Sequence, residues 1–321
     1  MKFSIKHLLF GLAIMMMTVT SSMAQSRKFI SQFSHFQGYF NPALTGYEGS
    51  MVRGFVRNQW AGIEGAPKTY FLSADLDFGE LSEKNDAALL GKNAVSVNLL
   101  QDNFGAFQEN ELTLNYASRI RLTQGLNLRL GTGVSYQRIR LDGNALNTKE
   151  ANDPVIGKYL GTFSNMNVLD FNVGMALTHA NYYLSYGIHR VNGGKMQQGD
   201  EFMEGYPAEH MLQAGFRQAA GENLAITSNF FYRSRMNLPD VMELNLKLLM
   251  MDRFWIGMGH RFDYASNMQA GFLTGKLRLG YVYEFPISGS YLLPGGIHEF
   301  TVALNLFRTN KRQNKDEVII W

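Results

Sequence analysis

Apolar and polar residues alternate along most of this chain, in long runs separated by short polar turns. In the run from 111 to 122 the even positions are apolar apart from Ser118, while the odd positions include Glu111, Arg119 and Arg121. Residues 126–137 repeat the pattern after the turn at Gln124-Gly125. Because successive side chains of a strand point to opposite faces, each run predicts a strand with one apolar and one polar face.

About thirteen such runs can be placed directly, and they continue to the end of the chain near Phe307. Bacterial single-chain barrels close with an even number of strands, each of about 9 to 11 residues across the bilayer. The pattern therefore predicts an all-β fold, a transmembrane antiparallel up-and-down β-barrel of 14 strands, with 12 as the second choice. A soluble sandwich or propeller also alternates, but the long strands and the aromatic, nearly uncharged apolar face favour the barrel.

The chain divides into four parts by composition. Residues 1–24 form a signal peptide, residues 25–49 an N-terminal segment expected to line or plug the lumen, residues 50–307 the barrel, and residues 308–321 a charged C-terminal tail read as flexible. Short connections such as Gln124-Gly125 are expected on the periplasmic side, and the longer stretches 142–167 and 191–209 outside the cell.

The first residues predict export. Lys2 and Lys6 precede an apolar run from Leu8 to Val19, and small residues then lead to a cleavage position after Ala24. The run is too short to cross a bilayer comfortably as a helix, which needs about 20 apolar residues, and no later stretch of that length exists. Together with the strand pattern, this predicts a protein of the outer membrane, in contact with its lipid.

Composition removes several classes of function. The chain has no cysteine, so it has no disulfide, lipoprotein acylation site or thiolate chemistry. Of 30 basic residues two lie in the signal peptide, and the remainder nearly balances 27 acidic residues, which gives no electrostatic case for nucleic acid. No zinc-site spacing, nucleophile elbow or phosphate-binding loop is present. We therefore expect no cofactor, no metal and no enzymatic activity.

Charged residues recur on the polar face of neighbouring predicted strands. Paired charges in a lumen either brace the wall or line an ion pathway, and the first reading is favoured. The candidate lumen charges are Asp75, Asp77, Glu111, Arg119, Arg121 and Arg129.

The most distinctive stretch lies early in the mature chain. It contains Q-F-S-x-F at 32–36, N-P-A-L-T-G at 41–46 and R-N-Q-W-A-G-I-E-G-A-P-K-T at 57–69. With the closing segment G-G-I-H-E-F-T-V-A-L-N-L-F at 295–307, these motifs resemble the PorP/SprF family of membrane proteins linked to the type IX secretion system of Bacteroidetes. The candidate partner-binding residues carried by these motifs are Asn41, Pro42, Gly46, Arg57, Asn58, Gln59, Trp60, Gly62, Gly65, Pro67 and Lys68.

The resemblance implies an outer-membrane component that works with secretion or gliding machinery. Its implied partners are machinery subunits and a large adhesin-like substrate, received through the substrate's C-terminal domain, which the barrel helps to export, retain or anchor. Two alternatives stay open on the residues alone. A porin or small-solute transporter is motivated by the polar inward face, and a lipid hydrolase by His179, His260 and His298 near strand ends.

Overall fold

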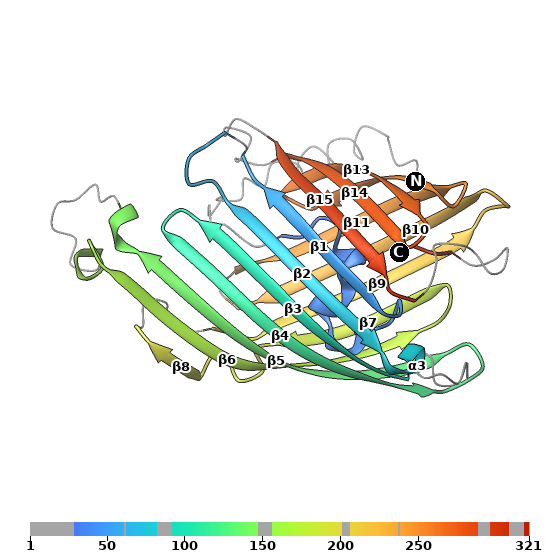
Figure 1. Ribbon diagram of the computed structural model, residues 1–321, viewed down its shortest axis with the longest axis horizontal. Helices are drawn as coiled ribbons and strands as arrows, with labels where there is room; N and C mark the ends of the chain where they lie inside the picture. Colours follow the sequence, from blue (N-terminus) through green and yellow to red (C-terminus); the bar gives the residue numbers. More distant parts are fainter. Residues whose placement is uncertain are drawn as a thin grey trace, which may run out of the picture.

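The computed structural model describes residues 29–60, 62–81, 92–146, 156–200, 206–236, 238–287, 296–307 and 318–320. Fifteen strands form one antiparallel sheet, in which β8 pairs only with β6, so fourteen strands close the wall (Figure 1). The first and last strands pair in full register, from Met51 opposite Asn305 to Asn58 opposite His298. The prediction of a 14-stranded antiparallel barrel is confirmed.

Consecutive wall strands pair with each other along the chain, with β7 pairing with β9 because β8 lies outside the wall, and β1 pairs with β15 to close the barrel. The wall strands are β1 (Met51–Asn58), β2 (Lys68–Asp77), β3 (Asn93–Phe104), β4 (Phe107–Arg121), β5 (Asn127–Asp142), β6 (Phe163–Thr178), β7 (Tyr182–His189), β9 (Glu209–Ala219), β10 (Leu224–Arg235), β11 (Leu238–Met250), β12 (Phe254–Arg261), β13 (Ala265–Thr274), β14 (Leu277–Pro286) and β15 (Ile297–Asn305).

The connections differ between the two ends of the barrel. At one end, the short-turn end, the chain turns at 122–126, 179–181, 220–223, 251–253 and 275–276; a longer connection there begins with helix α3 (Phe78–Leu81). The opposite, long-loop end carries the connections 59–67, 143–162 and 190–208. The connections formed by 142–167 and 191–209 thus lie at the end opposite Gln124-Gly125, as expected for longer loops.

Strand β6 extends beyond its neighbour β7 at the long-loop end. β4, β5 and β6 pair along their whole length, whereas β7 covers only residues 173–178 of β6. The short strand β8 (Met196–Gly199) covers 166–169 of β6 higher up. Both stretches read as loops from sequence therefore contain strand: 163–167 belongs to β6, and 196–199 forms β8. The parts of β5 and β6 nearest the long-loop end, residues 137–142 and 163–168, together with β8, are called the ledge below.

The outward face of the wall is apolar, as the alternation predicted. Exposed residues on neighbouring strands include Leu72, Leu99, Leu114, Val134 and Phe171. Inward positions are largely buried and often polar, which requires material in the lumen. Among the described residues, no helix combines the length and the apolar character needed to cross a bilayer.

The material in the lumen comes from both ends of the chain. Residues 29–50 run inside the barrel as three short helices, η1 (Phe33–His35), α2 (Gln37–Phe40) and η2 (Pro42–Leu44), drawn in blue within the wall in Figure 1. Residues 318–320 pack against the inner wall at the short-turn end. The charged stretch 308–317 lies outside the described residues. Two further single-turn helices, η3 (Gly143–Ala145) and η4 (Ile156–Lys158), belong to the β5–β6 connection.

Candidate functional site: the filled lumen

Residues 29–50, called the plug below, traverse the lumen from one end to the other. Phe29 packs on Tyr264 in the turn between β12 and β13, with ring centroids 4.7 Å apart, at the long-loop end. At the other extreme, the Tyr47 hydroxyl donates to the backbone carbonyl of His179 in a short turn (3.1 Å). The path of the plug is therefore lengthwise, and it closes the lumen over most of its height.

The N-P-A-L-T-G motif docks the half of the plug nearer the short-turn end, the lower half, against wall positions that are glycine. Asn41 bonds both ways: its Oδ1 accepts from the backbone of Ala43 (2.9 Å), and its Nδ2 donates to the carbonyl of Met175 on β6 (3.2 Å). A Cβ added to Gly131 would lie 2.2 Å from the Ala43 nitrogen, and one added to Gly174 only 1.9 Å from Asn41 Oδ1. The motif can dock only because these wall positions lack side chains.

Arg129 on β5 holds the same turn from the other side. Its Nε donates to the carbonyl of Ala43 (2.8 Å) and its Nη2 to that of Thr45 (2.7 Å). Gly46 follows with a φ of +64°, a backbone conformation that favours glycine. Charge-assisted bonds to two carbonyls satisfy backbone groups that would otherwise be buried without partners.

Aromatic rings fill the middle of the barrel. Phe36 of the plug meets Phe55 and Phe71 of the wall edge-on at 5.1 and 5.2 Å, and Phe40 lies 4.8 Å from Phe231 on the opposite side. Phe33, Phe36 and Phe40 belong to one buried cluster that joins β1, β2, β3, β9 and β10 through the plug. Burial of this apolar surface is the main term that keeps the plug in place.

A buried ion network holds the half of the plug nearer the long-loop end, the upper half. Arg57 on β1 contacts Glu284 (2.8 Å) and its cross-strand partner Glu299 (3.1 Å), and Arg261 contacts Glu284 (3.0 Å) and Glu243 (2.9 Å). All five side chains are at most 2 % exposed.

The plug completes this network with its backbone. The amides of Ser31 and Gln32 donate to the two oxygens of Glu299 (3.0 and 3.1 Å), and the Ser31 hydroxyl donates to Glu284 (2.6 Å). Arg57 also donates to that hydroxyl (2.7 Å). The Glu299 carboxylate of the wall therefore binds two consecutive backbone N–H groups, those of Ser31 and Gln32 in the plug.

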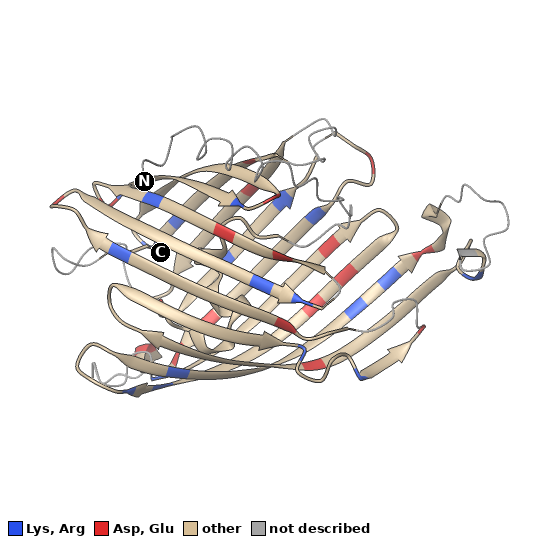
Figure 2. Cartoon of the chain, turned by 180° about the vertical axis from the view of Figure 1, so that it is seen from behind, with Lys and Arg blue, Asp and Glu red and all other residues tan. Residues whose placement is uncertain are grey.

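A second charged group lies at the short-turn end. Glu48 of the plug contacts Arg53 on β1 and Arg278 on β14, each at 3.4 Å. Burial favours the neutral acid, but Arg278, Arg53 and Arg217 together hold the pKa of Glu48 below its usual value. Figure 2 shows that basic and acidic residues lie along the wall strands rather than gathering at one end.

The candidate lumen charges do not form one group, and each contacts a different partner. Asp75 pairs with Arg53 (2.5 Å), Asp77 accepts from the amide of Gly79 at the start of α3, and Glu111 accepts from Tyr39 of the plug (3.4 Å). Arg129 binds the plug, as described above. Arg119 is partly buried opposite Arg129.

Arg121 does not face the lumen as expected. It is exposed, and it donates to the carbonyls of Thr123 and Gln124 in the short turn that follows β4 (3.2 and 3.3 Å). Its position at the very end of the strand explains the difference, because the side chain reaches past the rim of the wall.

The motif at 57–68 separates into an inner and an outer part. Arg57 belongs to the ion network, while Asn58 pairs with Lys68 at the strand ends and the amide of Gln59 donates to the carbonyl of Pro67 (3.0 Å). Trp60 is partly exposed and has a φ of +49°.

The rest of this motif forms the loop at the long-loop end. Gly62 and Gly65 have φ values of +98° and +71°, and both are exposed, as is Lys68. The carbonyl of Gly65 accepts from the amide of Gly105 (3.0 Å), which ties the loop to the turn between β3 and β4. The loop is thus specified by glycine conformations and offers its surface to the outside of the barrel.

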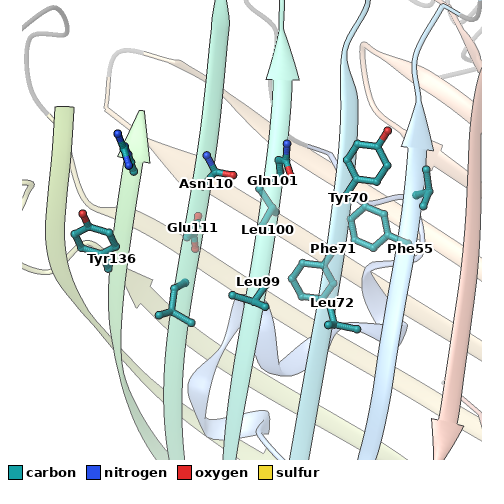
Figure 3. Close-up of a pocket in the computed structure, with 13 residues that line it drawn as sticks. Phe55, Tyr70, Phe71, Leu72, Leu99, Leu100, Gln101, Asn110, Glu111 and Tyr136 are labelled. Atoms are coloured by element: carbon teal, nitrogen blue, oxygen red, sulfur yellow. The ribbon is translucent and has the colours of Figure 1, made fainter. Parts of the chain in front are cut away.

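A hollow of about 550 Å³ lies in the wall formed by β1–β5 (Figure 3). Tyr70, Leu72 and Leu99 line it from the exposed outer face, and Phe55 and Phe71 from the buried inner face. The inner residues pack on Phe36 of the plug. Its lining is mainly apolar, so the hollow has the character of packing space beside the plug and not of a polar reaction site.

The histidines show no assembled catalytic group among the described residues. His260 Nδ1 lies 2.9 Å from Ser266 Oγ, and His298 Nδ1 lies 2.8 Å from the Tyr281 hydroxyl. Two other wall serines, Ser118 and Ser228, pair with Leu130 and Leu246 across the sheet. No cluster of three metal-ligating side chains occurs within the described ranges. The absence of enzymatic activity stays a prediction.

Sequence reasoning missed most of the residues that hold the plug. Glu243, Arg261 and Glu284 meet through neighbouring strands, whereas Arg57 reaches Glu284 and Glu299 only because the barrel closes; Arg53 pairs with Asp75 on the next strand. The available signal was their position: each occupies the polar face of an alternating strand, where a charge must find a buried partner.

Comparison with known proteins gives one family match. The family described as type IX secretion system membrane protein PorP/SprF matches residues 22–304, most of the chain. A search of curated proteins found no match.

Solved structures with a similar fold are outer-membrane barrels. Omp33 of Acinetobacter baumannii is 8% identical with a TM-score of 0.45, covering 80% of this chain and 97% of its own. The CymD monoaromatic hydrocarbon channel is 10% identical with a TM-score of 0.47, covering 85% and 91%. A FadL homologue of Pseudomonas aeruginosa is 8% identical with a TM-score of 0.42, covering 83% and 92%.

Proposed function

The chain belongs to the PorP/SprF family of type IX secretion system membrane proteins, and from this premise we propose that it serves the secretion machinery through protein–protein contacts. In this role it helps to export, retain or anchor large adhesin-like surface proteins, and the machinery subunits and the substrate's C-terminal domain are its partners. The short-turn end faces the periplasm and the long-loop end the cell exterior.

The observation that carries this proposal is the filled lumen. The plug crosses the barrel lengthwise, and its contacts include buried charges as well as a continuous aromatic cluster. A pore for small solutes would need this segment to leave its seat, at the cost of exposing buried charges and aromatic rings. A barrel built this way acts through its surfaces.

The ledge is the surface best placed to receive a partner. On the outer face of β5, the exposed positions Leu130, Val134 and Tyr136 are apolar, but the next outward positions are Arg138 and Arg140. Because charges are costly on a lipid-facing barrel surface near the bilayer midplane, this change marks the upper limit of the lipid-facing band. The ledge above Tyr136 therefore stands clear of the hydrocarbon.

The ledge also has the chemistry of a protein-binding surface. The Arg140 guanidinium lies over the ring of Phe163 on β6 (4.1 Å), and Arg138 donates to Asn165 (3.2 Å). Arginine next to an exposed aromatic ring is a combination enriched at protein interfaces.

Affinity purification from outer membranes in mild detergent tests the proposal. The wild-type protein should bring down secretion-machinery subunits or a large adhesin, and the double variant Arg138→Glu, Arg140→Glu should recover at least tenfold less of them. Arg253→Glu is the matched control, since Arg253 is exposed in a turn at the opposite end. A wild-type barrel recovered alone, together with normal adhesin display in a deletion strain, would contradict the proposal.

A further inference from the structure

The C-terminal residues of the chain occupy an apolar site at the short-turn end of the lumen. Val318 is 3 % exposed and Ile320 is fully buried, while Ile319 between them is only partly buried. Their site is formed by Ala225, Leu249, Trp255 and Leu273. Each of these wall residues stands one position from the end of its strand, beside the turns 220–223, 251–253 and 275–276.

Packing of side chains holds these residues in place. Residues 318–320 add no strand to the wall, and their alternating burial shows that two side chains enter the site while the third turns away. Apolar packing of this kind is non-directional. The site therefore selects for size and apolarity more than for a fixed backbone register.

Trp255 separates this site from the plug. Its indole ring lies 5.6 Å from the imidazole of His35 and 5.1 Å from the Lys247 ammonium. Behind it the wall has no side chain, since a Cβ on Gly271 would come within 2.2 Å of the indole. The site of residues 318–320 is thus a second apolar cluster, and Trp255 stands between it and the plug.

The sequence before the seated residues has the composition of a tether. Residues 308–317 include six charged side chains, whereas 318–321 is Val-Ile-Ile-Trp. A segment that belongs to the same chain as its site is present at a high effective concentration. Such an occupant needs little intrinsic affinity to fill the site, and it can be exchanged.

We propose that the site formed by Ala225, Leu249, Trp255 and Leu273 is a peptide-binding site at the short-turn end, which residues 318–320 of the chain itself occupy in cis. Its ligand in trans is an apolar peptide segment with bulky aliphatic residues at alternate positions. Residues 318–320 act as a competitor that keeps the site filled until such a segment displaces them. The inference is independent of the proposed role in secretion.

Fluorescence anisotropy in detergent tests this directly, with a labelled synthetic peptide of residues 316–321, Asp-Glu-Val-Ile-Ile-Trp, as the probe. A variant lacking 308–321 should bind the peptide saturably, and the full chain should bind it at least tenfold more weakly. The full-length double variant Val318→Asp, Ile320→Asp should bind like the deletion, because its own tail no longer fits. Ile319→Asp is the matched control and should stay closer to the wild type.

Two further results bear on the inference. A peptide with aspartate in place of its valine and of the second isoleucine should not bind any of these proteins. If neither the deletion nor the double variant binds the native peptide saturably, or if the full chain binds it equally well, the proposal is wrong. The double variant keeps the test valid should the deletion fail to fold, since both of its changes lie outside the wall.

Discussion

Removing the Arg57 side chain should loosen the upper half of the plug without breaking the wall. Arg57→Ala leaves Glu299 with only the two plug amides as partners, while Glu284 keeps Arg261. Breaking a fully buried ion pair by removing one partner costs about 3–5 kcal/mol. Because Arg57 binds Ser31 as well as both acids, much of this cost falls on the docking of the plug.

The lower figure corresponds to an increase of about 100-fold in the undocked population, at about 1.4 kcal/mol per factor of ten. A cysteine at Thr301 can report it, because this residue is 3 % exposed on β15 opposite Gly280, and a Cβ on Gly280 would meet Gln32 of the plug. The natural chain has no cysteine to compete for the reagent. The assay is the rate at which a hydrophilic maleimide modifies Thr301→Cys in detergent.

The reaction should be about 100-fold faster when Arg57→Ala is added, and Arg57→Lys should fall between, since lysine keeps the charge but not the forked geometry. Arg253→Ala, which removes an exposed arginine at the other end, should leave the rate unchanged. An Arg57→Ala rate within threefold of the Thr301→Cys parent would refute the claim that this network holds the plug.

Two further predictions concern the plug. Gly131→Ala should undock the N-P-A-L-T-G turn and lower the melting temperature of the barrel, because its Cβ would lie 2.2 Å from the Ala43 nitrogen. Gly157→Ala is the control and should leave the melting temperature unchanged, since nothing lies within 4 Å of its Cβ. Equal melting temperatures for the two variants would contradict the docking of the turn at Gly131. Burial, and then the charges of Lys247, Arg278 and Arg53, lower the pKa of His35, so docking should weaken as the pH falls below the undocked value of about 6.5. Acrylamide quenching of Trp255, with Trp60 and Trp321 replaced by phenylalanine, should rise between pH 7.5 and pH 5 and stay flat in His35→Gln; equal pH dependence in both proteins would exclude His35 as the cause.

The wall was predictable from the sequence because its signal is local. A strand that meets lipid on one face must alternate, so Glu111–Leu122 and Leu126–Gln137 could be placed as a hairpin. Counting such runs gave about thirteen, and the even strand number of single-chain barrels then led to fourteen. The strand part of 163–167 and the strand β8 were missed, because polar residues such as Asn165 and Gln198 leave no apolar stripe above the lipid band.

The interior was less predictable because its partners are distant in sequence. The pairs Arg57–Glu284 and Arg57–Glu299 span more than two hundred positions, and only closure of the barrel brings them together. The motif residues Asn41, Gly46 and Arg57 were recognised as distinctive, but their task in this structure is to fix the plug. The packing of residues 318–320 in the lumen could not be predicted, because the sequence shows only three aliphatic residues after a charged stretch.

Single-channel recording tests the central claim most directly. The mature protein, reconstituted in planar bilayers at neutral pH, should show no steady conductance, because the plug fills the lumen from Phe29 at one end to Tyr47 at the other. The Arg57→Ala variant in the same bilayers should show openings that the wild type lacks. A steady, ohmic conductance from the wild-type protein would mean that the lumen is an open pathway, and it would contradict the account.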